Sequence, residues 1–293
     1  MSDLYSQMVD QFEGENYTKV IESAKKLLRA GPQENYVDIF LIKAEAESRR
    51  GLKEEALRTF SEAIVQIPDA FEPSFQKSLL LCDLHRYKEA NTELNILNEK
   101  FPQNLDVLHN LIFTEERTFN QERVIELCDH ILSFSEPEWS VLSSKGKACE
   151  RMGNYDEAIL LYESAVNLGN LHEIELSLLN MDIGYAYSLK EDFISARTFL
   201  EKALSYDDDP HTLHHLAWVE YNLGNTDTAF ELLKTSISLE PDNSYAFKVA
   251  AKINLLQHNN EAAISNLQEA KSLGYEIEYG QEVNDLLQTL GVE

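Results

Sequence analysis

Residues 146–166 read GKACERMGNYDEAILLYESAV. Small residues stand at Gly146 and Ala158, and Tyr162 and Ala165 follow Ala158 at helical spacing. The same arrangement recurs along the chain, for example in residues 44–68, which end on a proline. A pattern that returns about every 34 residues is typical of a solenoid, in which short supersecondary units stack on one another.

The second small residue of each unit recurs at intervals of 34, 34, 34, 38, 33 and 34 residues, at Ala56, Ala90, Val124, Ala158, Ala196, Ala229 and Ala263. Its partner stands twelve positions earlier, at Ala44, Ser78, Ile112, Gly146, Gly184, Ala217 and Ala251. Two antiparallel helices approach closely only where their side chains are small. We therefore expect each unit to be a helical hairpin, and we expect the bulkier pair Ile112 and Val124 to make the fourth unit the least stable.

In these paired small residues and their spacing, the chain resembles the tetratricopeptide repeat (TPR) family, whose unit is a 34-residue helix-turn-helix. The matching positions are turn glycines, aromatic residues after the turn and closing prolines: Gly51, Gly153, Gly224, Tyr87, Tyr155, Pro68, Pro102 and Pro241. The terminal stretch GYEIEYGQEV (274–283) also resembles the ends of bacterial TPR proteins with many repeats. The resemblance implies an all-α fold, a right-handed α-solenoid of about eight hairpins.

We expect one solenoid over residues 1–293, with repeats at 1–36, 37–70, 71–104, 105–138, 139–176, 177–209, 210–243 and 244–277. A capping helix is expected over 278–291, because its apolar residues follow i, i+3, i+4, i+7 spacing, at Tyr279, Val283, Leu286, Leu287 and Leu290. Glu282 falls outside this stripe and is expected to face water.

The composition indicates a folded, acidic protein of the cytoplasm. Residues 1–153 carry a net charge of 18 − 27 = −9 and residues 154–293 carry 7 − 24 = −17, which together give −26. Such a field repels phosphate backbones, so nucleic acid is a poor partner and a basic partner is a better one. No apolar run is long enough for a membrane span. Cys128 and Cys149 fall at core positions of the repeat and are expected to be buried thiols.

The sequence contains none of the phosphate-binding, zinc-protease or serine-hydrolase motifs. His211, His214 and His215 cluster, but no second His or Cys pair accompanies them, and Asp209 with Pro210 is an ordinary helix start. The sequence therefore predicts a non-enzymatic protein without a cofactor or bound metal.

The resemblance implies that the first helix of each hairpin lines the concave groove. The positions it carries over form the expected peptide-binding set: Phe75, Phe113, Lys147, Tyr185, His214, Trp218, Tyr221, Tyr245, Lys248 and Lys252. Aromatic side chains give large contact areas at low entropic cost and dominate binding hot spots. These positions predict a scaffold or adaptor that holds a protein or peptide segment, basic or with exposed apolar side chains, in this groove. Some of the rings could instead pack between hairpins.

The family's clamp for a C-terminal carboxylate is not matched, since Asn110 is an isolated match and the pair Lys248 and Lys252 has no following hairpin to complete it. Two other functions remain open at this point. One is a self-associating structural spacer, and the other is a receptor for a short peptide or small ligand. The oligomeric state and the identity of the partner do not follow from the sequence.

Overall fold

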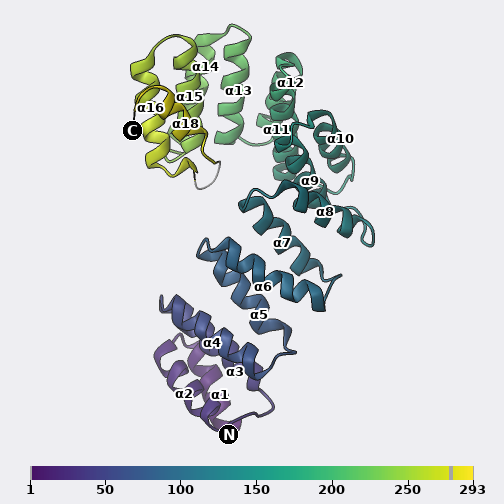
Figure 1. The fold of residues 1–293 in the computed structure, drawn as a ribbon, viewed down its shortest axis with the longest axis vertical. Coiled ribbons are helices and arrows are strands. Elements are labelled where there is room, and N and C mark those ends of the chain that lie inside the picture. The colour runs from purple at the N-terminus through teal and green to yellow at the C-terminus, as the bar shows by residue number, and fades with distance from the viewer. Residues whose placement is uncertain (1, 277–279, 293) are drawn as a thin grey trace. The chain divides into compact units, whose positions relative to one another are not determined.

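The computed structural model describes residues 2–276 and 280–292. Within these residues every regular element is an α-helix, and seventeen helices follow one another along the chain (Figure 1). Seven pairs of consecutive helices among those described pack against each other as hairpins, so the predicted all-α architecture of helical hairpins is confirmed. The chain divides into two compact units, residues 1–123 and 124–293.

The first unit consists of successive antiparallel helices: α1 (Ser2–Glu13), α2 (Tyr17–Arg29), α3 (Tyr36–Arg49), α4 (Lys53–Gln66), α5 (Phe71–Asp83), α6 (Tyr87–Lys100) and α7 (Leu105–Arg117). Its first helix packs on α2 through Met8, which is fully buried. The next helix, α8 (Gln121–Leu132), contains the boundary between the units, which falls after Arg123.

The second unit continues with α9 (Trp139–Arg151), α10 (Tyr155–Val166), α11 (Glu173–Leu189), α12 (Phe193–Leu204), α13 (Pro210–Asn222), α14 (Thr226–Leu239), α15 (Ser244–Leu256), α16 (Asn260–Ser272) and α18 (Glu282–Thr289). Here the first helices of successive hairpins touch one another directly, α9 with α11, α11 with α13, and α13 with α15. These four helices therefore share one face of the unit, and side chains from different repeats can meet there.

Local sequence signals set the ends of these helices. Gly51, Gly153 and Gly224 adopt positive φ angles of 76°, 82° and 88° in the turns within their hairpins, a conformation that glycine reaches without steric cost. The Asp209 side chain accepts a hydrogen bond from the Thr212 N–H at 2.6 Å, and Pro210 begins α13. The helix start predicted at Asp209 and Pro210 is confirmed.

The start of α11 differs from the simple repeat. This helix begins at Glu173, inside the segment 139–176 that the sequence assigns to the fifth repeat. The Glu175 carboxylate accepts a hydrogen bond from the His172 N–H at 2.7 Å, which stabilises the earlier start. The extra helical turn accounts for the longer interval of 38 residues between Ala158 and Ala196.

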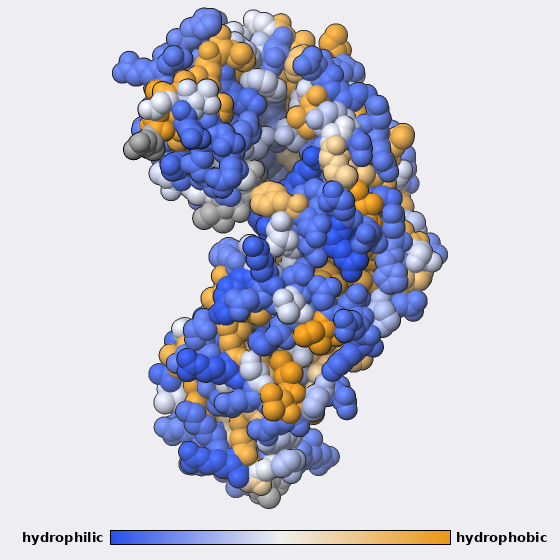
Figure 2. Space-filling view, viewed as in Figure 1, coloured by the Kyte–Doolittle hydropathy of each residue, from blue (hydrophilic) through white to orange (hydrophobic). Residues whose placement is uncertain are grey.

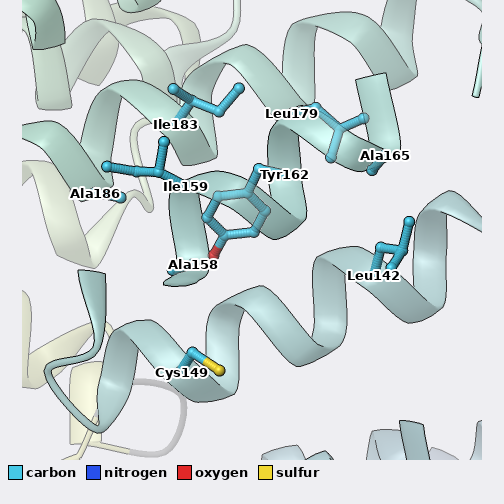
Figure 3. Close-up of a cluster of buried hydrophobic side chains, with 9 residues drawn as sticks. All are labelled: Leu142, Cys149, Ala158, Ile159, Tyr162, Ala165, Leu179, Ile183 and Ala186. Atoms are coloured by element: carbon cyan, nitrogen blue, oxygen red, sulfur yellow. The ribbon is translucent and has the colours of Figure 1, made fainter. Parts of the chain in front are cut away.

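One buried cluster of the second unit is built around Tyr162, a fully buried side chain on α10 (Figure 3). Its ring packs among Ile159, Leu179 and Ile183, and Cys149 lies on the facing helix α9. The phenol hydroxyl donates to Glu150 Oε2 at 3.3 Å. Cys128 and Cys149 are both buried, as the repeat positions predict.

At the C-terminal end, Val283 and Leu287 of α18 are buried against Ala251, Leu267 and Ala270. This contact agrees with the apolar stripe of the expected capping helix, although Tyr279 lies outside the described residues. The visible surface is mostly hydrophilic, with scattered apolar side chains (Figure 2). No helix in the described ranges is long and apolar enough to span a membrane.

Candidate functional site

Aromatic and basic side chains from three successive first helices converge in the second unit. Together with neighbouring residues they line a cavity of about 190 Å³. We call this the aromatic–lysine pocket, and its side chains are Tyr185 of α11, His215 and Trp218 of α13, and Tyr245, Lys248 and Lys252 of α15. Five of these six residues belong to the predicted set, and His215 is the addition.

Tyrosine and histidine rings form one wall of the pocket. The hydroxyl groups of Tyr185 and Tyr245 lie 3.1 Å apart and share a hydrogen bond. The ring of His215 lies 4.4 Å from that of Tyr185 and 5.3 Å from that of Tyr245, between ring centroids. Burial raises the pKa of Tyr185 and lowers that of His215 to about 3, so both side chains are neutral at physiological pH.

His214, which the sequence placed in the groove, is buried with 1% of its surface exposed. Its ring stacks on Tyr245 at 4.7 Å, and its Nδ1 lies 3.4 Å from Nδ2 of Asn243. Burial lowers its pKa, and the neighbouring His215 adds to this effect. Successive residues of a helix are rotated by about 100°, which explains why His215 lines the pocket and His214 does not.

The two lysines have different surroundings. Lys248 is only 4% exposed, and its Nζ lies 3.7 Å from the ring centroid of Tyr245. Burial lowers the pKa of Lys248, and the nearby Glu282 partly offsets this effect. Lys252 is half-buried, with its Nζ 5.1 Å from the ring centroid of Trp218. Cation–π contacts of this kind hold both ammonium groups against aromatic faces.

Glu282, at the start of α18, partly offsets the charge of the two lysines. Its Oε2 lies 3.3 Å from Nζ of Lys248, and its Oε1 lies 3.3 Å from Nζ of Lys252. Burial favours the neutral carboxyl group, but the two ammonium groups outweigh burial and lower the pKa of Glu282. The apolar periodicity of α18 placed Glu282 in water, and the structure corrects this expectation, because Glu282 meets residues about 30 positions away in sequence.

Tyr221 and Lys147 belong to the same unit but do not line the pocket. Tyr221 stacks beside Trp218, with ring centroids 6.4 Å apart, and packs against the core of α13, α14 and α15. Nζ of Lys147 on α9 lies 3.4 Å from Oδ2 of Asp182. Lys147 thus belongs to a polar group on α9 and α11 that also includes Glu150.

Phe75 and Phe113 lie in the first unit, outside the aromatic–lysine pocket. Phe75 stacks on Phe71 of the same helix at 5.1 Å, and Phe71 in turn meets Phe101 at 5.3 Å. Phe113 is 36% exposed and lines a separate, open pocket of about 880 Å³. The guanidinium carbon of Arg117 lies 5.3 Å from the Phe113 ring centroid, and Tyr87 meets the same ring edge-on.

The described residues contain no group of three or more His, Cys, Asp or Glu side chains that could hold a metal ion. His211 does approach His214, with ring centroids 5.4 Å apart, but its Nε2 lies 3.5 Å from a carboxylate oxygen of Glu240. The histidine cluster of α13 is therefore explained by packing and by this contact.

A family model described as the tetratricopeptide repeat matches residues 140–168, 179–210 and 210–243. These three matches fall on the hairpins from α9 to α14 and include all of the α11 and α13 side chains of the pocket. No protein among those with curated records matches the sequence.

Solved structures show the same fold at low sequence identity. A chain of the APC/C hetero-tetramer Cut9–Hcn1 has a TM-score of 0.61 and 16% identity, over 98% of this chain and 55% of that one. This protein thus spans about half the length of that chain. The C-terminal part of a TPR repeat-containing protein from Cytophaga hutchinsonii has a TM-score of 0.60 and 15% identity, over 84% of this chain and 98% of that one.

A tetratricopeptide repeat protein from Parabacteroides merdae matches 98% of both chains, with a TM-score of 0.51 and 16% identity. At such identities these likenesses concern the fold alone. The three family matches show tetratricopeptide repeats between residues 140 and 243, and the solved structures show that the fold of the chain resembles that of tetratricopeptide repeat proteins.

Proposed function

We propose that this protein is a non-enzymatic scaffold that binds a segment of a partner protein at the aromatic–lysine pocket. Tetratricopeptide repeats and the structural neighbours support a protein-interaction scaffold in general. The finer proposal, a bound segment at this site, rests on one observation. Aromatic rings from α11, α13 and α15 converge with two ammonium groups on a single cavity.

The composition of the pocket suits recognition of a protein segment. Trp and Tyr are enriched at binding hot spots because they offer large, rigid contact areas with a polar end. Trp218 and Tyr245 are only partly buried by the repeats, which leaves part of each ring to contact a partner. The lysines add charged hydrogen-bond donors beside these rings. The pocket can therefore select a partner side chain by both its shape and its charge.

The size of the pocket favours a protein segment over a small ligand at this site. Its volume of about 190 Å³ lies below the roughly 300–1,000 Å³ of pockets that enclose drug-sized ligands. A space of this size accepts one or two side chains. The remaining contacts of a bound segment would then come from the shared face of α9, α11, α13 and α15.

A photo-crosslinking experiment tests this proposal. We would place p-benzoylphenylalanine at Leu189, which lines the pocket, and at Leu160, which is 63% exposed on α10, and irradiate cells of the native host. We expect a partner to be captured through position 189 and lost when Trp218→Ala is added. Equal capture through both positions, or capture that survives Trp218→Ala, would contradict the proposal and favour a structural spacer.

The open pocket of the first unit carries a second candidate function, a receptor for a short peptide or small ligand. Its volume of about 880 Å³ lies in the range of ligand-binding pockets, and Phe113, Tyr87 and Arg117 supply aromatic and charged groups. A thermal-shift screen of short peptides and metabolites, repeated with Phe113→Ala, tests it. Stabilisation of the parent that Phe113→Ala abolishes is the expected result, and no stabilisation by any compound would count against it.

A further inference from the structure

The aromatic–lysine pocket already contains a carboxylate from the protein itself. Glu282 reaches from α18 to the two lysines of α15. Each of its two carboxylate oxygens lies 3.3 Å from a different ammonium nitrogen. The Tyr275 hydroxyl donates to Oε2 of Glu282 at 3.2 Å. Both oxygens of this carboxylate therefore have partners. A carboxylate is thus a group that the two lysines can bind.

The buried ammonium group of Lys248 requires a negatively charged partner. Lys248 is almost fully buried, and its Nζ lies 5.7 Å from the ring centroid of Tyr275 as well as close to Tyr245. A buried ammonium group is stable only with a compensating partner, and Glu282 is the carboxylate that meets it. When Glu282 turns away, the two lysines lose the negative charge that partly offsets theirs, and another carboxylate can take its place.

Apolar contacts also hold α18 in place. Val283 and Leu287, on the other side of the helix, are buried against α15 and α16. The Glu282 side chain is 42% exposed at the edge of the pocket, so it can rotate into water while α18 stays in place. A competing carboxylate can therefore replace it without unfolding the capping helix.

We propose that Lys248 and Lys252 form a carboxylate subsite, which Glu282 occupies in the free protein and an Asp or Glu side chain of the partner segment occupies in the complex. This inference rests on the proposed function. The overall charge of −26 favours a basic partner at long range, but the lysine pair gives this pocket the opposite local sign. The partner segment is thus one with an acidic residue next to an aromatic or aliphatic one, and Glu282 weakens its binding by competition.

An array of capped 12-residue peptides of random sequence, probed with the full-length labelled protein, tests this inference. We expect peptides with Asp or Glu to be enriched among those that bind the parent. Glu282→Gln should raise their affinity roughly three- to tenfold, the range expected when a half-exposed competing ion pair is removed. Asp285→Asn, an exposed change on the same helix, is the matched control and should leave the affinity unchanged.

The double variant Lys252→Gln with Glu282→Gln distinguishes competition from a general change in α18. We expect it to lose both the gain in affinity and the preference for acidic residues. If peptides bind and depend on Trp218 but show no acidic preference in any variant, the inference is wrong while the proposed function stands. If no peptide binds, or if Trp218→Ala binds like the parent, the proposed function fails and the inference fails with it.

Discussion

Gly146 of α9 lies directly against the ring of Tyr162 on α10. A Cβ atom at Gly146 would lie 2.5 Å from Cε1 of Tyr162 and 2.9 Å from Cδ1, closer than real Cβ contacts allow. Tyr162 is fully buried, so the ring has no free space to move into. The sequence pattern pairs Gly146 with Ala158, but the tight contact is with the residue one turn further along α10.

Gly146→Ala should therefore destabilise the second unit. Overpacking typically costs about 1–3 kcal/mol, which outweighs the roughly 1 kcal/mol that alanine gains over glycine inside a helix. Thermal or urea denaturation measures the change. In a Tyr162→Leu background the same substitution should cost much less, because the clashing ring atoms are gone. A Gly146→Ala variant as stable as the parent would show that the two helices can separate without cost.

Glu150 makes the stability of this region depend on pH. Burial raises the pKa of Glu150 to about 8, and the neighbouring Asp182 adds to the effect. The folded chain therefore retains a proton that the unfolded chain releases above about 4.5. The resulting stability is fully present below 4.5 and is lost as the pH rises through 8.

We expect the free energy of unfolding to fall by about 1–2 kcal/mol between pH 6 and pH 9, less than the full shift implies because water partly reaches the side chain. Glu150→Gln keeps an acceptor for the Tyr162 hydroxyl and should flatten this dependence. Glu201→Gln, an exposed change on α12, should keep the parental profile. Equal stability of the parent at both pH values would contradict the assignment.

The fourth repeat is predicted to open most readily. Ile112 and Val124 occupy the crossing positions at which the other repeats have smaller residues, and the boundary between the two compact units falls inside this repeat, after Arg123. In a linear array, a repeat with weak internal packing is where cooperative unfolding can break. Hydrogen exchange should show lower protection over 105–138 than over 139–176. Matching protection in the two segments would be the opposite result.

The fold could be predicted from the sequence because each repeat carries local signals for its own turns and helix starts. Gly153 and Pro210 act through the conformation of their own backbone, so their effects are visible without any tertiary information. The start of α11 at Glu173 was not predicted, because it depends on a local capping bond between His172 and Glu175 and not on the repeat period.

The site was only partly predictable for two physical reasons. Repeat phase located Trp218, Tyr245 and Lys248, but a one-residue difference decides that His215 lines the pocket while His214 is buried. Glu282 could not be assigned from periodicity, since its partners lie on α15 and are set by how α18 packs. The apolar pattern of a helix predicts which of its faces is buried. Ion pairs between distant elements can be identified only from the tertiary structure.

In the proposed function Trp218 anchors the partner segment, and the affinity of the protein for that segment measures this role. Once the segment is identified by crosslinking, isothermal titration would compare the parent with Trp218→Ala, Trp218→Phe and the exposed first-repeat control Glu22→Ala. We expect Trp218→Ala to cost about 2 kcal/mol, or roughly 30-fold in Kd, the loss typical of a buried interface tryptophan. Trp218→Phe should retain most of the affinity, and Glu22→Ala should match the parent. A folded Trp218→Ala variant that binds with parental affinity would contradict the account.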